Sequence, residues 1–235
     1  MKSSALFLAA SLLAAVASHA WAADSDKSAA PKPDKDGFYS LFDGKSLAGW
    51  KEADFYGAGK VQVKDGVIRM EKGKLMTGIT YIKGDFPKMD YEVTLEGKKG
   101  EGNDFFCTTT FPVRDAFCSL VIGGWSGTVV GLSSIDFMDA SMNETRSERE
   151  FKTDQWYRFR IRVSQKRIEA WIDQEKVVDI DTTDRRISIR IECDPCTPFG
   201  IATYETTGTV RDIRVRRLSE AEKKTIAETK PARKE

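Results

Sequence analysis

The sequence predicts an all-β fold in which two antiparallel sheets pack face to face as a sandwich. Short segments that alternate apolar and polar residues recur between residues 60 and 217, and turns rich in Gly and Asp separate them. Such period-two alternation is typical of antiparallel strands with one buried and one solvated face. No long segment with a 3.6-residue apolar period interrupts them. Two sheets of this kind bury their apolar faces against each other.

The first 36 residues are predicted to precede the folded domain. Residues 1–23 combine Lys2, an apolar run of Ala, Leu and Phe, and an Ala-Trp-Ala cleavage site, the pattern of a cleaved signal peptide. The apolar run is shorter than the roughly 20 residues that a membrane span needs. Residues 24–36 are polar and are expected to form a disordered leader. We therefore expect a periplasmic or extracellular protein with no membrane span and one sandwich domain at 37–218.

The elements of this domain are expected in the following order. Lys60–Val63 and Val67–Met70 flank an Asp-Gly pair, the signature of a β-hairpin with a two-residue turn. The other segments that alternate cleanly between apolar and charged side chains are Met89–Glu96, Trp156–Val163, Arg186–Glu192 and Arg211–Arg217. After them, Ser219 and Glu222 have the spacing of a capping box, which predicts a short polar helix at the start of the C-terminal segment 219–235.

The charge balance argues against polyanionic partners. Lys and Arg total 37 and Asp and Glu total 36, which gives a net charge of +1. A chain with so little net charge has no long-range field to attract nucleic acid or an anionic membrane surface. We therefore expect no nucleic-acid partner.

The chain has four cysteines, and the predicted export makes disulfides between them a possibility, because an oxidising compartment favours disulfides. Cys107 and Cys118 lie in neighbouring strand-like segments joined by a turn that contains Pro112, and we predict a disulfide between them. Cys193 and Cys196 have C-x-x-C spacing, which leaves a tight disulfide, a redox pair, half of a zinc site or two free thiols open. No βαβ pattern and no second pair of zinc ligands accompanies them, so a small-loop disulfide or free thiols are favoured.

Residues Gly37–Trp50, GFYSLFDGKSLAGW, closely resemble the opening of the 3-keto-disaccharide hydrolase domain family. Further segments that resemble motifs of this family are Val63–Ile68, Met89–Val93, Trp156–Ile161 and Val210–Val215. The resemblance covers 37–218. It implies a concanavalin A-like jelly roll, akin to glycoside-hydrolase and laminin-G sandwiches, and a carbohydrate or glycoside as partner.

The middle of the chain, 102–143, differs from the family pattern. Asn103 stands at the family's asparagine position and is the first candidate for substrate contact. The E-x-D-x-x-E strand of sandwich glucanases is absent. The only histidine, His19, lies in the predicted signal peptide, so histidine-dependent acid–base chemistry is excluded from the mature chain.

Carboxylates are the remaining candidates for catalysis. Cleavage of a glycosidic bond usually needs two carboxyl groups, about 5 to 5.5 Å apart for retention and further apart for inversion. Glu92 and Glu96 share a strand face but lie roughly 13 Å apart, so they cannot form this pair. The candidates are Glu96, Asp104 and Asp136 for catalysis and Asp139 and Glu144 for substrate contact. A solvated charge or a turn cap is the more frequent role of such residues.

Tryptophans are candidates for sugar binding, because aromatic rings stack on the C–H faces of sugars while polar groups surround the rim. Trp125 stands between glycines in a loop-like segment, and Trp171 falls on the polar face of its segment. For each of them, a binding platform and a packing residue are equally open interpretations. Trp50 and Trp156 are expected in the core.

An acidic loop and a stripe of arginines could each bind a ligand or have only a structural role. The polar loop that contains Asp136, Asp139 and Glu144 could hold calcium, but it matches no recognised ligand pattern, so we expect no cofactor. An arginine stripe at positions 158, 160 and 162, extended by those at 186, 190, 214 and 216, could form a cross-strand charge ladder or a site for acidic glycans.

Two functions follow from these observations. The first is an exported glycoside hydrolase-like protein that acts on 3-keto-glycosides through carboxylates on the concave sheet. The second is a non-catalytic carbohydrate-binding or envelope-associated sandwich that kept the fold and lost the acids.

Overall fold

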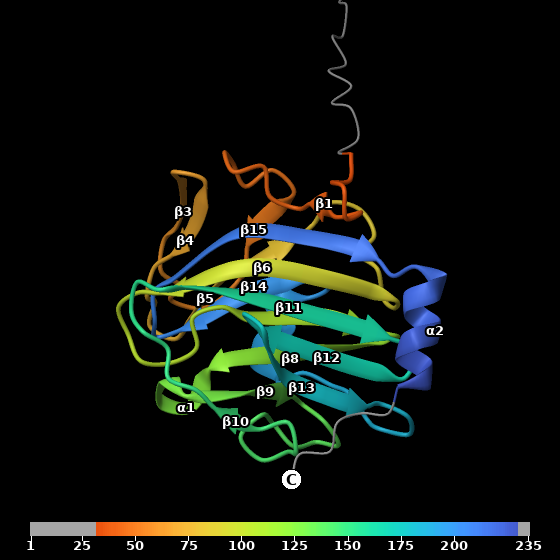
Figure 1. The fold of residues 1–235 in the computed structure, drawn as a ribbon. Helices are drawn as coiled ribbons and strands as arrows, with labels where there is room; N and C mark the ends of the chain where they lie inside the picture. The colour runs from red at the N-terminus through yellow and green to blue at the C-terminus, as the bar shows by residue number, and fades with distance from the viewer. Residues whose placement is uncertain (1–31, 230–235) are drawn as a thin grey trace, which may run out of the picture. The chain divides into compact units, whose positions relative to one another are not determined.

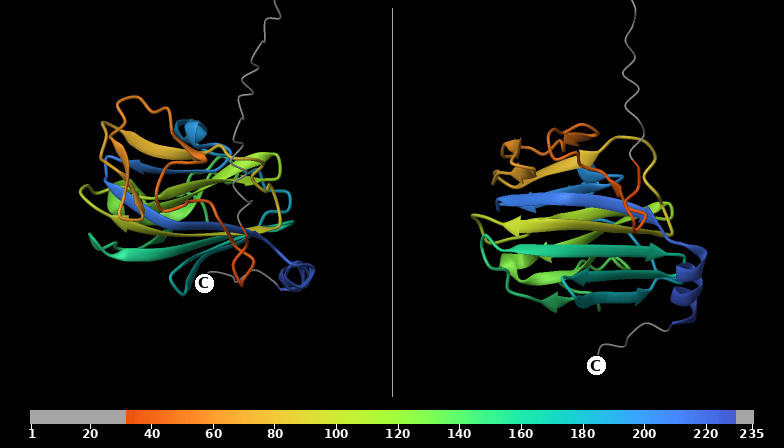
Figure 2. Two further views of the ribbon diagram at one scale, coloured as in Figure 1. Left: turned by 90° about the horizontal axis from the view of Figure 1, so that it is seen from above. Right: turned by 45° about the horizontal axis from the view of Figure 1, so that its top comes forward.

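The computed structural model describes residues 32–229, and in this part of the chain two antiparallel sheets pack face to face (Figures 1 and 2). The eight-stranded sheet runs in the order β13 (Glu175–Asp181), β12 (Arg167–Ile172), β11 (Trp156–Ser164), β6 (Tyr91–Lys99), β15 (Gly208–Arg217), β4 (Val67–Met70) and β3 (Val61–Lys64), with β1 (Tyr39–Ser40) paired to β15. The seven-stranded sheet runs in the order β10 (Ser147–Glu148), β9 (Val129–Ser133), β8 (Ala116–Gly123), β7 (Thr108–Val113), β14 (Gly200–Tyr204), β5 (Met76–Tyr81) and β2 (Trp50–Glu52). The predicted all-β sandwich is confirmed.

Apolar side chains at alternate strand positions fill the space between the two sheets. Val93 and Leu95 on β6 and Phe159 on β11 are buried there, as their alternation predicted. Leu120 and Leu132 face them from β8 and β9 of the other sheet. Full burial of one such side chain contributes about 1.5–3 kcal/mol, so this layer is the main stabilising feature of the domain.

The predicted hairpin forms between β3 and β4. Val61 pairs with Met70 and Lys64 with Val67, so two residues make the turn. Asp65 and Gly66 have φ angles of 51° and 77°. Two consecutive positive φ angles are what a type I′ turn requires, and Asp-Gly supplies them at little steric cost.

The predicted strand at Arg186–Glu192 is wrong. Ile187 makes an isolated bridge to Ile135, and a short 3₁₀ helix, η1 (Ile191–Cys196), then begins. Ile191 is 80% exposed instead of buried. Ile187 still packs in the core between the sheets, whereas Ile189 packs against the outward cluster of Cys193 and Cys196. η1 lies over the outward side of the seven-stranded sheet, where the Thr80 hydroxyl donates to the Pro195 carbonyl. The alternating isoleucines of the segment therefore meet different neighbours and do not form one strand face.

The predicted disulfide between Cys107 and Cys118 is also wrong, because the strand register keeps these two buried cysteines apart. In the β7–β8 hairpin, Cys118 lies opposite Phe111. Phe111 is four residues from Cys107, which corresponds to roughly 13 Å along a strand, far beyond disulfide reach. The turn between these strands falls at Arg114 and Asp115, whereas Pro112 lies within β7.

The two ends of the described chain contact the eight-stranded sheet. The predicted signal peptide and residues 24–31 of the predicted leader lie outside the described residues. Within the rest of the leader, Asp34 accepts the amide of Phe38 and pairs with Arg214. At the other end, Ser219 and Glu222 form the predicted capping box of α2 (Glu220–Glu228). In Figure 1, α2 lies beside the ends of β11 and β12. None of the helices in residues 32–229 is long and apolar enough to cross a membrane.

Candidate functional site

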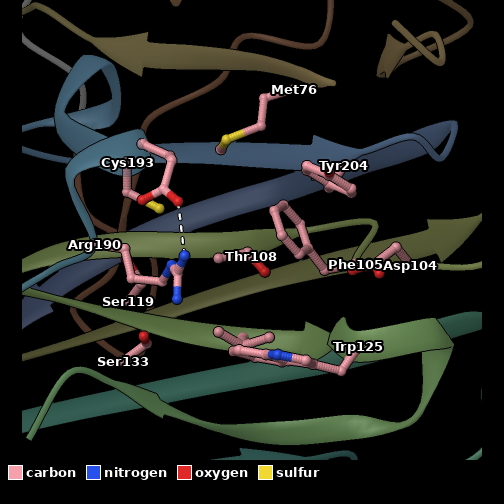
Figure 3. A pocket seen from close by; sticks show the side chains of 12 residues that line it. Met76, Asp104, Phe105, Thr108, Ser119, Trp125, Ser133, Arg190, Cys193 and Tyr204 are labelled. Atoms are coloured by element: carbon pink, nitrogen blue, oxygen red, sulfur yellow. Dashed lines mark hydrogen bonds and ion pairs between the residues drawn. The ribbon is translucent and has the colours of Figure 1, made fainter. Parts of the chain in front are cut away.

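A pocket of about 300 Å³ opens on the outward side of the seven-stranded sheet (Figure 3). Its floor consists of strand residues that alternate with the core residues of β7, β8 and β9, and its walls come from the segments around Phe105, Trp125 and η1. The residues that line it are Met76, Asp104, Phe105, Thr108, Ser119, Val121, Trp125, Ser133, Arg190, Glu192, Cys193 and Tyr204. We call it the Trp125 pocket. Its volume is at the lower end of that of small-molecule sites, about 300–1,000 Å³.

Trp125 forms one aromatic wall. It is 41% exposed, and in Figure 3 its ring lies across the pocket from Met76 and Tyr204. Trp125 belongs to α1 (Gly124–Gly127), a tight turn in which Trp125 and Ser126 have φ angles of 47° and 70°. Non-glycine residues adopt this conformation only when their surroundings hold them there.

Asn103 and Asp104 hold this turn from the facing loop. The Asn103 side-chain amide donates to the carbonyl of Ser126 at 2.9 Å, and the Asp104 carboxylate accepts the Ser126 amide at 3.1 Å. The second oxygen of Asp104 accepts the amide of Phe105, which lines the pocket beside Tyr204. Three sequence-predicted residues, 103, 104 and 125, therefore meet at one place. Asn103 is a support of the turn and not one of the pocket-lining residues.

Arg190 and Glu192 supply the charged wall; the sequence placed Arg190 only in the predicted arginine stripe and did not identify Glu192 as a site residue. The Arg190 guanidinium donates to Glu192 at 2.7 Å and to Asp139 at 2.9 Å. The hydrogen bond from Arg190 lowers the pKa of the Glu192 carboxyl, and the same bond raises the pKa of Arg190. Glu192 is therefore ionised at neutral pH. The sequence signal was obscured because Arg186–Glu192 alternates like a strand.

Asp136, Asp139 and Glu144 lie together in the loop after β9, but their carboxylates bind arginines. Arg185 contacts both Asp136 and Glu144 at 2.5 Å. The backbone amide of Arg186 and the side chain of Arg185 lower the pKa of Asp136. These contacts fasten the segment that leads to Arg190, and only Asp139 touches a residue of the Trp125 pocket. Within residues 32–229, no group of three or more His, Cys, Asp or Glu side chains could hold a metal ion.

Glu96 and Trp171 lie on the outward side of the eight-stranded sheet, away from the Trp125 pocket. Glu96 accepts a hydrogen bond from Arg211 at 2.8 Å. Trp171 is only 7% exposed, because the Arg160 guanidinium lies 3.8 Å from its ring centroid. Glu96, Asp104 and Asp136 thus do not form one catalytic group.

The arginines of this outward side form the cross-strand ladder predicted as one alternative. Arg162 binds Glu169 and Arg216 binds Glu92. Trp156, expected in the core, lies on this side instead, with the Arg211 guanidinium 4.0 Å from its ring centroid. The arginines at 186 and 190 belong to the other side of the molecule and do not extend the ladder.

Comparison with known proteins agrees with the sandwich and its family motifs. The sequence model of a family described as 3-keto-alpha-glucoside-1,2-lyase-like domain matches residues 37–216. Among curated proteins, none matches the chain.

Solved structures share the fold at low identity. A carbohydrate esterase of the Shiga toxin-encoding bacteriophage phi24B is 12% identical, with a TM-score of 0.52 over 78% of this chain and 100% of that one. Crh5 transglycosylase bound to NAG is 15% identical, with a TM-score of 0.52 over 80% and 87% of the two chains. Domain 4 of AbnA, a GH43 extracellular arabinanase from Geobacillus stearothermophilus in complex with arabinotriose, is 16% identical, with a TM-score of 0.50 over 82% and 97%. The predicted jelly-roll sandwich is thus one that carbohydrate-active proteins share.

Proposed function

The chain belongs to the 3-keto-alpha-glucoside-1,2-lyase-like domain family, and on that premise we propose that it binds a glycoside in the Trp125 pocket. The observation that carries the proposal is the open indole of Trp125 on the wall of a pocket with a polar floor. The exposed ring offers a stacking surface for the C–H face of a sugar. Hydroxyls of Thr108, Ser119 and Ser133 and the Arg190–Glu192 pair supply hydrogen-bonding partners for sugar hydroxyls.

The pocket charges favour a neutral glycoside over an acidic one. Asp104 and Glu192 contribute two carboxylates to the walls, and Arg190 is the only cation among the lining residues. Arg190 is also paired with Asp139 and Glu192, so two protein carboxylates already balance its positive charge. An anionic ligand would meet net negative charge, which costs binding energy in a partly desolvated site.

For catalysis, the charges of this pocket fit an elimination better than hydrolysis by a carboxyl pair. A ketone at C3 acidifies the proton on C2; a base removes that proton, and the bond from C1 to the leaving oxygen breaks with its electrons. Glu192 is held ionised by Arg190 and can act only as such a base, whereas a carboxyl-pair glycosidase also needs a protonated acid. The Arg190 cation beside Glu192 suits the negative charge that develops on the ketone oxygen.

A non-catalytic binding module is the second candidate, and Asp104 favours it. Both oxygens of the Asp104 carboxylate already accept backbone amides, from Phe105 and Ser126. In this role the carboxylate builds the pocket wall and is not free to take a proton from a ligand. Both candidates predict glycoside binding, and only the first predicts product.

The decisive experiment combines binding and turnover. The protein without residues 1–23 is mixed with 3-keto-trehalose, 3-keto-lactose and the parent disaccharides; calorimetry measures binding and chromatography measures released sugar. We expect binding in the low-millimolar range or tighter, and Glu192→Gln should abolish any product release. Glu144→Gln is the matched control, because Glu144 pairs with Arg185 outside the pocket. Binding without product would select the non-catalytic candidate, and no binding of any glycoside would refute the proposal.

Export completes the proposal. The features of residues 1–23 support cleavage after Ala22 or Ala23 and a periplasmic or extracellular site of action. Fractionation of the producing cell and N-terminal sequencing of the protein test this part separately. An uncleaved chain found in the cytoplasm would contradict it without affecting the glycoside site.

A further inference from the structure

The two cysteines of η1 face the same way because of the helix type. In a 3₁₀ helix three residues make one turn, so side chains at positions i and i+3 eclipse each other. Cys193 and Cys196 have this spacing within η1, and in the structure both are free, buried thiols. One 3₁₀ turn rises about 6 Å, which puts their Cα atoms within the range of roughly 4.4–6.8 Å that disulfides span.

The surroundings of η1 keep this geometry in place. Cys193 and Cys196 pack with Met76 and Ala202 in a small apolar cluster on the outward side of the seven-stranded sheet. The Pro195 carbonyl accepts the Thr80 hydroxyl at 2.6 Å, which ties the turn between the two thiols to β5. Bridging these two thiols therefore requires no movement of one element against another.

The two thiols differ in their access to the pocket. Cys193 is 8% exposed and lines the Trp125 pocket, whereas Cys196 is 1% exposed and is not among the lining residues. Cys193 is adjacent in sequence to Glu192, the charged residue of the same wall. A reagent that enters the pocket can reach Cys193 first, and Cys196 only through Cys193.

We propose that Cys193 and Cys196 are a disulfide-forming pair that locks η1, and with it the Glu192 wall of the Trp125 pocket. This inference does not depend on the bound sugar, and its test reads the cysteines directly. The other two cysteines of the chain, Cys107 and Cys118, cannot take part, because both face the space between the sheets.

The chemistry needs a disulfide-bearing oxidant, such as oxidised glutathione or an oxidised dithiol protein. The Cys193 thiolate attacks one oxidant sulfur, a mixed disulfide forms, and the first thiol leaves. The Cys196 thiolate then attacks the Cys193 sulfur, which closes the 193–196 bond and releases the second thiol. Two protein thiols are oxidised, and one small disulfide is reduced to two thiols, which take up the two protons that the protein thiols lose. Burial raises the pKa of both protein thiols, so the exchange is slow, as suits a structural pair better than a catalytic one.

The test uses the chain without residues 1–23 in its native state. The protein is equilibrated with oxidised glutathione, quenched with N-ethylmaleimide and digested with trypsin. The mass of the peptide 191–211 is then measured by mass spectrometry. We expect this peptide to carry no alkyl group and two hydrogen atoms fewer than its reduced form. Cys107 and Cys118, alkylated after unfolding, are the internal controls and should remain thiols. The oxidised form should melt about 5 °C higher than the reduced form.

Two single variants make the order of events falsifiable. In Cys196→Ser, the pocket-facing Cys193 should be trapped as a mixed disulfide with glutathione; in Cys193→Ser, the buried Cys196 should remain unmodified. A native peptide 191–211 that carries two alkyl groups after equilibration would overturn the proposal. Glutathionylation of Cys196 in Cys193→Ser would overturn the order of attack.

Discussion

The two outward sides of the sandwich carry similar residue types but use them differently. On the eight-stranded sheet, arginines and carboxylates bind one another across strands, and Trp171 is covered by Arg160. On the seven-stranded sheet, the strands present hydroxyls and small residues, and Trp125 remains open above them. A side that satisfies its own charges stabilises the fold, and a side that leaves an aromatic ring and polar groups open can bind a ligand.

The contrast predicts that substitutions on the two sides separate stability from ligand binding. Changes on the eight-stranded side should lower the free energy of unfolding and leave glycoside affinity unchanged. Changes in the Trp125 pocket should lower glycoside affinity and leave the free energy of unfolding nearly unchanged.

The largest effect is expected from the buried charge of Glu169. Its side chain is 3% exposed and contacts Arg162 at 2.6 Å and Lys176 at 2.7 Å. Glu169→Gln leaves these cations without their counter-charge, and breaking such buried pairs typically costs about 3–5 kcal/mol. Because Arg162 and Lys176 can partly rehydrate, we expect a loss of about 3 kcal/mol in urea-induced unfolding.

Glu175 provides the matched control for Glu169. It pairs with Arg149 at 2.7 Å, but its side chain is 70% exposed. Glu175→Gln should cost less than about 0.5 kcal/mol, because exposed ion pairs contribute little. Equal losses in the two variants, or a change of glycoside affinity in Glu169→Gln, would contradict the division between the two sides.

The two tryptophans give the most direct test of the comparison. Trp171→Ala removes a covered ring with its cation–π contacts and should cost about 3 kcal/mol of stability with no change in glycoside affinity. Trp125→Ala removes an open ring and should lower affinity about tenfold or more, with a stability change below about 1 kcal/mol. Thermal unfolding and calorimetric titration of both variants measure the four values. The assignment would be wrong if Trp171→Ala lowered glycoside affinity, or if Trp125→Ala lowered stability and left glycoside affinity unchanged.

A smaller effect concerns the pH dependence of the eight-stranded side. The hydrogen bond from Arg216 lowers the pKa of Glu222 from its usual 4.5 to about 2. A depressed carboxyl pKa gives stability that is complete above about pH 4.5 and is lost as the pH falls toward 2. Since Glu222 is partly exposed, we expect a loss of about 1–2 kcal/mol over this range. Glu222→Gln should flatten this part of the stability–pH curve, and Glu228→Gln, at an exposed position of α2, should leave it unchanged.

The sequence predicted the fold better than the site for a physical reason. Strand alternation reports burial against the facing sheet, and β6, β11 and β15 follow it. The Trp125 pocket depends on which loops cross the outward side, and this information is non-local. Arg190 and Glu192 lie 51 and 53 residues beyond Asp139, so no local pattern connects them.

Three of the predicted site residues do lie at the Trp125 pocket or its supporting turn, and local sequence patterns had identified them. Asn103 and Asp104 follow a glycine turn, and Trp125 stands between glycines that permit its tight turn. Glu96, Asp136, Asp139 and Glu144 were predicted only because their side chains are acidic. Each of them binds an arginine that is distant in sequence or in an adjacent strand. Residue type alone does not distinguish a catalytic carboxylate from one half of an ion pair.

The smallest expected effect tests how the pocket obtains its open ring. Asn103 contacts the Trp125 turn through the Ser126 carbonyl and does not line the pocket. Asn103→Ala should therefore weaken glycoside binding about threefold to fivefold, with a stability change below about 1 kcal/mol. If Asn103 acts by positioning Trp125, the same substitution should have no further effect in a Trp125→Ala background, because the ring that it positions is gone. Calorimetric titration of the four proteins of this double-mutant cycle measures the coupling. Additive losses would instead mean that Asn103 touches the ligand itself, and the supporting role assigned to it here would be wrong.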